Sequence, residues 1–206
     1  MSLSPLLRTA PIAVVLAATA WTAGPVAQAL PPIGIDTARV TIAGSSNIHE
    51  YTASTTKVRV TRVKVGAAVA GEAFWSDVVK PGALEAFELA ISAGSLSSPK
   101  AGLDKNMHKA LKVEQFADIT FRLTRLEGAT AGAVRAIGVL RIAGVEREVV
   151  LDLKTTRKDG LLVVTGSVPL LMTDYGIKPP SAMLGMLKTD PKVTVSFETV
   201  LAVPLT

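Results

Sequence analysis

The amino-acid sequence predicts an all-β protein, an extended antiparallel barrel of about eight strands with one short amphipathic helix. Three observations lead to this fold. Apolar residues recur at every second position over much of the chain, turn sequences separate these runs, and one segment has helical spacing. Strands with one apolar and one polar face are typical of antiparallel sheets. About eight such strands must hide that face in a sandwich or a closed barrel, and a single inserted helix favours the barrel.

Four segments alternate cleanly between apolar and mostly polar residues. Because successive side chains of a strand point to opposite faces, the apolar set of each segment is expected to face the barrel interior. The four sets are Phe87, Leu89 and Ile91; Ile119, Phe121 and Leu123; Val149, Leu151 and Leu153; and Val193, Val195 and Phe197. Further strands are expected at residues 39–43, 51–68, 133–143 and 161–172.

Turn sequences and one change of phase mark where these strands end or bend. The turn signals are Glu127-Gly128, Ala143-Gly144 and Lys158-Asp159-Gly160. The last lies between two apolar runs and predicts a tight hairpin. Between Val60 and Val63 the apolar phase shifts, which predicts a bulge or bend within the strand.

Helical spacing appears over residues 102–111, where apolar residues at i, i+4, i+7 and i+8 make one apolar face. Asp104 lies near the start of this helix, where a carboxylate caps the helix or complements its dipole. A second short helical turn is expected in a late loop, from Ser181 to Lys188, because prolines bound that segment on both sides.

The first 29 residues have the layout of a secretory signal peptide. Arg8 gives a positive start, an apolar stretch covers residues 10–23, and a small-x-small site ends at Ala29. The apolar stretch is too short to span a bilayer comfortably. Cleavage after Ala29 would leave one domain, residues 30–206, with the periplasm as its location. A retained N-terminal anchor is the alternative.

The composition excludes several kinds of function. The chain has no cysteine, so it has no disulfide, thiolate metal site or cysteine nucleophile. It contains no nucleophile elbow, zinc-protease motif or phosphate loop, so an enzyme is not expected. The net charge of +5 is spread out rather than gathered in a stripe, which argues against nucleic-acid binding. A mild attraction to anionic lipid headgroups would allow transient contact with a membrane surface.

The two histidines are far apart in the sequence and, without a third partner, make a poor zinc site. His49 has three readings: a contact to a ligand headgroup, a metal ligand, or a histidine at the barrel end bonded to backbone. His108 stands beside three lysines on the predicted helix and is expected to be solvated.

Four stretches follow one another over nearly the whole chain after the signal peptide: residues 44–51; residues 95–98 with 103–111; residues 119–121 with 138–145; and residues 172–180. In this order they resemble the YceI-like family of periplasmic lipid- or polyisoprenoid-binding proteins. Tyr51 stands where tryptophan is common in the family, and Ala117 stands where proline often precedes the next strand.

The resemblance implies an extended lipocalin-like barrel that holds an isoprenoid lipid or a quinone tail. No other cofactor and no metal are expected. The expected role is that of a periplasmic carrier or sequestering protein. A fully packed structural or interaction protein without a ligand is the alternative. An outer-membrane barrel is a third class, but it requires an apolar outer face, and here that face carries Arg122, Asp152, Lys154 and Glu198.

The candidate lining of the interior consists of apolar side chains from strands, helix and loops. The strands contribute Phe87, Leu89, Phe121, Leu123, Leu151 and Phe197, and the helix contributes Met107 and Leu111. Phe74 and Trp75 precede a predicted loop at Ser76 and Asp77. A mouth or lid is expected from Met172, Tyr175, Met183 and Met186. Flexible thioethers suit an adaptable apolar surface. Ordinary core packing is the alternative reading of each of these residues.

Overall fold

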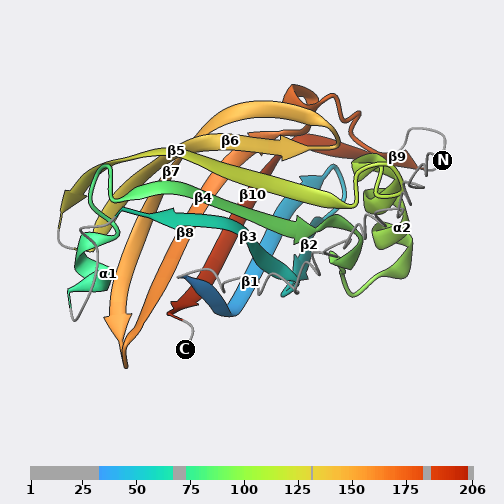
Figure 1. The fold of residues 1–206 in the computed structure, drawn as a ribbon. Helices are drawn as coiled ribbons and strands as arrows, with labels where there is room; N and C mark the ends of the chain where they lie inside the picture. The colour runs from blue at the N-terminus through green and yellow to red at the C-terminus, as the bar shows by residue number, and fades with distance from the viewer. Residues whose placement is uncertain (1–32, 67–72, 131, 183–186, 204–206) are drawn as a thin grey trace, which may run out of the picture.

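The computed structural model describes residues 33–66, 73–130, 132–182 and 187–203 (Figure 1). The described strands are β1 (Gly34–Ser46), β2 (Glu50–Thr55), β3 (Val58–Val65), β4 (Leu84–Ser92), β5 (Asp118–Thr130), β6 (Ala133–Ile142), β7 (Val145–Lys158), β8 (Leu161–Leu171), β9 (Ser181–Ala182) and β10 (Leu187–Ala202). The described helices are α1 (Phe74–Asp77), α2 (Ala101–Leu111) and two 3₁₀ turns, η1 (Ala93–Ser95) and η2 (Met172–Tyr175). The predicted signal peptide, Met183 and Met186 lie outside the described residues.

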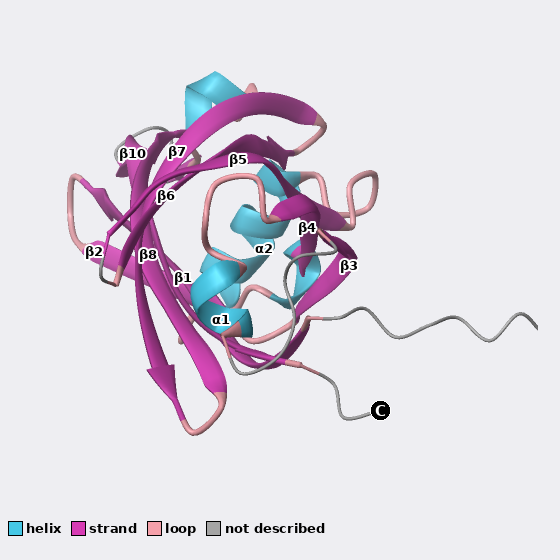
Figure 2. Ribbon diagram, turned by 60° about the vertical axis from the view of Figure 1, so that its left-hand side comes forward, coloured by secondary structure: helices cyan, strands magenta, loops and turns pink. Residues whose placement is uncertain are grey.

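The sheet is antiparallel throughout and runs in the order β2-β1-β10-β8-β7-β6-β5-β4-β3, with β9 paired to β10. It curls into a barrel-like wall, with α1 at one end and α2 at the other, and both helices lie within the ring of strands when viewed from the end (Figures 1 and 2). The predicted all-β barrel fold is confirmed. In the described part of the chain, no helix is long and apolar enough to cross a membrane.

The predicted alternation places side chains as expected. All twelve apolar residues of the four cleanly alternating segments line the interior. Two bulges keep the apolar face turned inward along longer strands. One falls between Val60 and Arg62 in β3, as the phase shift predicted, and the other falls between Leu123 and Arg125 in β5, after which Leu126 faces the interior.

Tight hairpins join the later strands. At the β7–β8 turn, Asp159 and Gly160 have φ of 51° and 78°, the positive values that a type I′ turn requires, and the predicted hairpin is confirmed. Ala143 and Gly144 form the β6–β7 turn in the same way. The predicted turn at Glu127 and Gly128 is wrong, because Gly128 lies in an irregular stretch inside β5, which continues to Thr130.

Two other predicted elements also need correction. Residues 51–68 do not form one strand but contribute to β2 and β3. The helical turn expected from Ser181 to Lys188 is wrong in its described part, because Ser181–Ala182 forms β9 and pairs with the start of β10. The Pro179-Pro180 pair favours an extended backbone at Lys178 and Pro179, and the Thr189 N–H donates to the Pro180 carbonyl at 3.2 Å, so the chain enters β9 extended and already bonded to β10.

β2 and β3 are the two edge strands of the sheet, and we call the line where they face each other the seam. In the described residues, no ladder of hydrogen bonds pairs β2 with β3 across the seam. β1 and β3 approach each other along it. Near α2, Ser54 and Ser97 exchange two main-chain hydrogen bonds, with N···O distances of 2.8 and 3.0 Å. The segment that follows β4 therefore takes the place of a paired strand at this end of the seam.

Next to these bonds, a buried hydroxyl forms hydrogen bonds that connect the two sides of the seam. Thr55 is only 5% exposed. Its Oγ1 accepts the Lys57 N–H at 3.0 Å and, because Ser95 Oγ already donates to the Ser92 carbonyl, Thr55 donates to Ser95 Oγ at 2.6 Å. The turn from β2 to β3 is thus bonded to the turn that follows β4.

We expect Thr55→Val to destabilise the protein by about 1–2 kcal/mol, because an isosteric methyl group removes both hydrogen bonds and leaves the part-buried Ser95 hydroxyl and the Lys57 N–H without this partner. Urea unfolding followed by circular dichroism measures the change. Thr194→Val, on the exposed face of β10, is the matched control and should change stability by less than about 0.5 kcal/mol. Equal midpoints for the two variants would contradict a structural role for the Thr55 hydroxyl.

Candidate ligand-binding cavity

The interior of the barrel is not filled by its own side chains. A first chamber of about 180 Å³ lies toward α1 and is lined by residues from β1, β3 to β8 and β10. Its lining is aliphatic or aromatic except for Thr155 and Thr199. A void with such walls offers water almost no hydrogen-bond partners, so it favours a hydrocarbon guest over water.

A second chamber of about 190 Å³ lies toward α2. It shares Val40, Ile91, Leu140 and Val195 with the first chamber, so the two adjoin inside the barrel. Together they reach the lower part of the range of small-molecule sites, roughly 300–1,000 Å³. The interior thus offers one elongated apolar space between the two helices.

α1 closes the end of the first chamber. Trp75 is 5% exposed, and its Nε1–H donates to the Gly160 carbonyl at 2.6 Å, which fastens the helix to the β7–β8 turn. A second bond, from Arg157 to Ser76 Oγ at 2.9 Å, joins α1 to the end of β7. Ser76 and Asp77, expected in a loop, are therefore part of a helix that is bonded to the wall.

α2 closes the end of the second chamber, as the helical spacing predicted. Its apolar face places Leu103, Met107, Ala110 and Leu111 on the chamber. Asp104 lies in the first turn, and its Oδ1 accepts the Ser98 N–H at 2.7 Å, while Lys100 holds the N-cap position. The carboxylate therefore does not cap the helix; it fixes the loop before α2, and its position in the first turn complements the helix dipole, as expected.

His108 is half-buried, and the expectation that it is solvated is wrong. Its Nε2 lies 2.8 Å from the Leu96 carbonyl, to which it donates, because a carbonyl oxygen only accepts. His49 is exposed, and its carbonyl accepts the Ser46 N–H in the β1–β2 turn. In the described residues, no three His, Asp or Glu side chains gather into a metal site.

Two aromatic rings lie against glycines of the neighbouring strands and so leave the middle of the barrel open. A Cβ on Gly138 would meet Phe121 Cζ at 2.5 Å, and a Cβ on Gly166 would meet Phe197 Cζ at 2.6 Å. Each ring therefore occupies the space that a side chain would fill on the wall. The rings of Phe121 and Phe197 therefore lie along the wall and do not reach across the interior of the barrel.

Two tyrosines lie at the α2 end of the cavity. Tyr175, in η2, is 3% exposed; burial, and secondly the charge of Asp174, raise the pKa of its phenol. Tyr51, in β2, lies over Gly44, and burial, followed by the charge of Asp190, raises its pKa above 10. Both phenols therefore stay protonated and uncharged at neutral pH.

The structure distributes the sequence-predicted lining over both chambers. Trp75, Phe87, Leu89, Phe121, Leu123, Leu151 and Phe197 line the first chamber, and Met107, Leu111, Met172 and Tyr175 line the second. Phe74 lines neither and packs edge-on against Trp75, with ring centroids 5.0 Å apart. Their role in binding stays a prediction.

Sequence reasoning missed wall residues on the less regular strands. They include Val58 on β3, Val134 and Ala136 on β6, and Leu162 and Val164 on β8. The run from Leu161 to Val164 is apolar at every position, so its inward phase cannot be read from the alternation. Pairing with the cleanly alternating β7 and β10 would have fixed that phase.

The barrel resembles solved structures of low sequence identity. A polyisoprenoid-binding domain from Saccharophagus degradans has a TM-score of 0.63 at 14% identity, covering 85% of this chain and 100% of that one. BcnA from Burkholderia cenocepacia has a TM-score of 0.62 at 12% identity, covering 80% and 96%. A YceI protein from Campylobacter jejuni has a TM-score of 0.51 at 16% identity, covering 76% and 82%.

At these identities the structural likeness shows the fold, and the family rests on the sequence. No curated protein sequence gives a significant match. The model of the YceI-like domain matches residues 35–201, which include nearly all the strands that build the cavity wall. An antiparallel barrel around an elongated apolar space agrees with that match, and the chain belongs to the YceI-like domain family.

Proposed function

We propose that the protein binds a long apolar lipid, of the isoprenoid or quinone-tail type, inside the barrel. The single observation that carries this proposal is the pair of adjoining apolar chambers, which an ordinary packed core would not leave vacant. The likeness to the domain from Saccharophagus degradans, described as polyisoprenoid-binding, supports the same class of ligand. The role is that of a carrier or sequestering protein rather than an enzyme.

The energetics suit a hydrocarbon guest. Each buried CH₂ group contributes roughly 0.8 kcal/mol, so a tail of several isoprene units gains well over 10 kcal/mol before the costs of ordering it. Such a guest needs a dry channel and no hydrogen bonds along its length. The alternative, a structural protein with a filled interior, does not account for a void of this size.

The proposed place of action is the periplasm. The first 29 residues support this through their signal-peptide layout. Intact-mass measurement of the protein recovered from its native host should give a chain that begins at Leu30. A mass that includes residues 1–29 would instead mean that the N-terminal segment is retained as an anchor.

Filling the first chamber should abolish lipid uptake without unfolding the protein. Leu151 and Val150 are neighbours in β7; the first lines the chamber and the second is 48% exposed. We expect Leu151→Trp to reduce co-purified lipid at least tenfold, as measured by native mass spectrometry and solvent extraction. Val150→Trp adds the same bulk to the outer face and should keep the wild-type lipid content.

Circular dichroism and thermal unfolding must show that both tryptophan variants are folded. A folded Leu151→Trp protein with undiminished lipid would place the binding site elsewhere. Protein from the native host that carries no extractable lipid, and that takes up none from added prenyl lipids, would contradict the proposed function itself.

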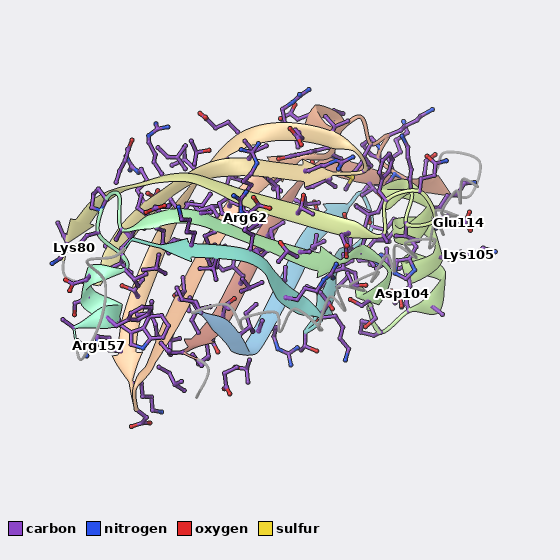
Figure 3. The ribbon with its side chains drawn as sticks, in the orientation of Figure 1. Arg62, Lys80, Asp104, Lys105, Glu114 and Arg157 are labelled. Atoms are coloured by element: carbon purple, nitrogen blue, oxygen red, sulfur yellow. The ribbon has the colours of Figure 1, made fainter. Side chains whose placement is uncertain are left out.

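A carrier must meet membranes, and we propose that it does so with the α2 end. Residues 100–114 contain four lysines and two carboxylates. Lys105 and Lys109 lie one turn apart on α2, Lys112 follows as its C-cap, and all three are exposed. Lys105 lies at this end of the molecule and Lys80 at the opposite end (Figure 3). Ile48, which is 62% exposed on the β1–β2 turn, adds an apolar side chain at the same end of the molecule.

Vesicle sedimentation tests this surface. Each lysine near an anionic bilayer contributes about 1 kcal/mol, so replacing Lys105, Lys109 and Lys112 by glutamine should weaken binding to phosphatidylcholine–phosphatidylglycerol vesicles tenfold or more. The same replacement of Lys80, Lys154 and Lys158 is the control and should have a small effect. Equal losses in the two triple variants would show only a general charge effect and would contradict a specific surface.

A further inference from the structure

The apolar interior continues into a polar pocket at the α2 end. This pocket, which we call the vestibule, has a volume of about 330 Å³ and lies between residues 46–52 of the β1–β2 region and residues 98–106 around the start of α2. It shares Tyr51, Leu103, Asn106 and Thr189 with the second chamber. An amphiphile whose tail fills the chambers would therefore place its polar head here.

The two ends of the cavity differ in chemistry. In the described residues, the first chamber has only the hydroxyls of Thr155 and Thr199 as polar lining groups, and its α1 end is closed by Trp75, Val78 and Val79. A polar head placed at that end would lose its hydrogen bonds to water without regaining them, which costs several kcal/mol. The apolar end of a ligand can be buried there at no such cost.

The charges of the vestibule do not favour an anionic head. Its lining brings together Lys100 and Glu50, one ammonium and one carboxylate, along with His49. Asp104 adds a second carboxylate at the edge, through its bond to the Ser98 N–H. A phosphate or diphosphate would meet carboxylates at close range with a single lysine to balance them, and like charges repel most strongly where water is partly excluded.

The shared residues suit an uncharged head instead. The Asn106 amide, the Thr189 hydroxyl and the Tyr51 phenol each both donate and accept hydrogen bonds, and none carries a charge. All three line both the chamber and the vestibule, so they lie where the head of a ligand would join its tail.

We propose that the vestibule is a binding subsite for an uncharged polar lipid head, a hydroxyl or a quinone carbonyl, with the lipid oriented so that its tail ends beside Trp75. This inference rests on the proposed function and adds to it the direction of the ligand and the chemistry of its head. It distinguishes free prenyl alcohols and prenyl quinones from prenyl phosphates and diphosphates with the same tail.

Two ligands with one tail test the chemistry of the head. Geranylgeraniol and geranylgeranyl diphosphate are each titrated against the delipidated protein loaded with the fluorescent apolar probe N-phenyl-1-naphthylamine. The alcohol should displace the probe at least tenfold more tightly than the diphosphate. Equal or tighter binding of the diphosphate would overturn the inference.

A charge variant sharpens this comparison. Glu50→Lys turns the vestibule positive and should narrow the preference for the alcohol at least fivefold, mainly by strengthening diphosphate binding. Glu148→Lys makes the same change in charge on the exposed face of β7 and is the matched control. A preference that shifts equally in both variants would mean that the head does not lie in the vestibule.

Photo-crosslinking tests the direction. A prenyl alcohol with a diazirine next to its hydroxyl should label residues 46–52 or 98–106, and one with the diazirine at its far end should label residues 74–79 or the adjoining wall. The reverse pattern would overturn the orientation. If neither ligand displaces the probe and neither crosslinks, the proposed function is contradicted. If the ligands bind but the diphosphate is preferred, or the crosslinks are reversed, only this inference is contradicted.

Discussion

The structure depends on one constraint: the concave face of the sheet consists almost entirely of hydrocarbon, and its exposure to water is unfavourable. Period-two alternation along the strands produces this face, and the two bulges maintain it where a straight strand would turn its apolar side chains outward. Both ends must then be covered, and α1 and α2 do so with Trp75 at one end and Met107 and Leu111 at the other. Interior, caps and closure thus follow from one pattern in the sequence.

The same constraint explains why the protein carries few sharp motifs. A hydrocarbon guest is held by surface area and by exclusion of water, so many combinations of Val, Leu, Ile and Phe would serve equally well. Among the described residues, the polar side chains that line both the apolar space and the polar pocket are Tyr51, Asn106 and Thr189, at the α2 end. Glycines opposite Phe121 and Phe197 add a constraint of shape, because they let large rings pack without obstructing the channel.

Prediction from sequence succeeded where a pattern was periodic and failed where one residue type serves several structures. Alternation placed the inward faces of β4, β5, β7 and β10, and spacing placed α2. The Gly128 signal predicts a turn although glycine also permits a bulge. The prolines around residues 181–188 predict a helical turn, whereas its described start, Ser181–Ala182, pairs with β10 as a strand. The polar pocket escaped notice because residues far apart in the chain build it: Glu50, Lys100 and Thr189 meet only in the folded barrel.

The wall of the barrel is not equally strong around its circumference. Separating two laddered strands breaks a full row of main-chain hydrogen bonds. At the α2 end of the seam, in the described residues, β2 is joined to the segment after β4 by two such bonds at Ser54 and Ser97 and by the hydroxyl of Thr55. The seam is therefore the place where the wall would open lengthwise at the lowest free-energy cost.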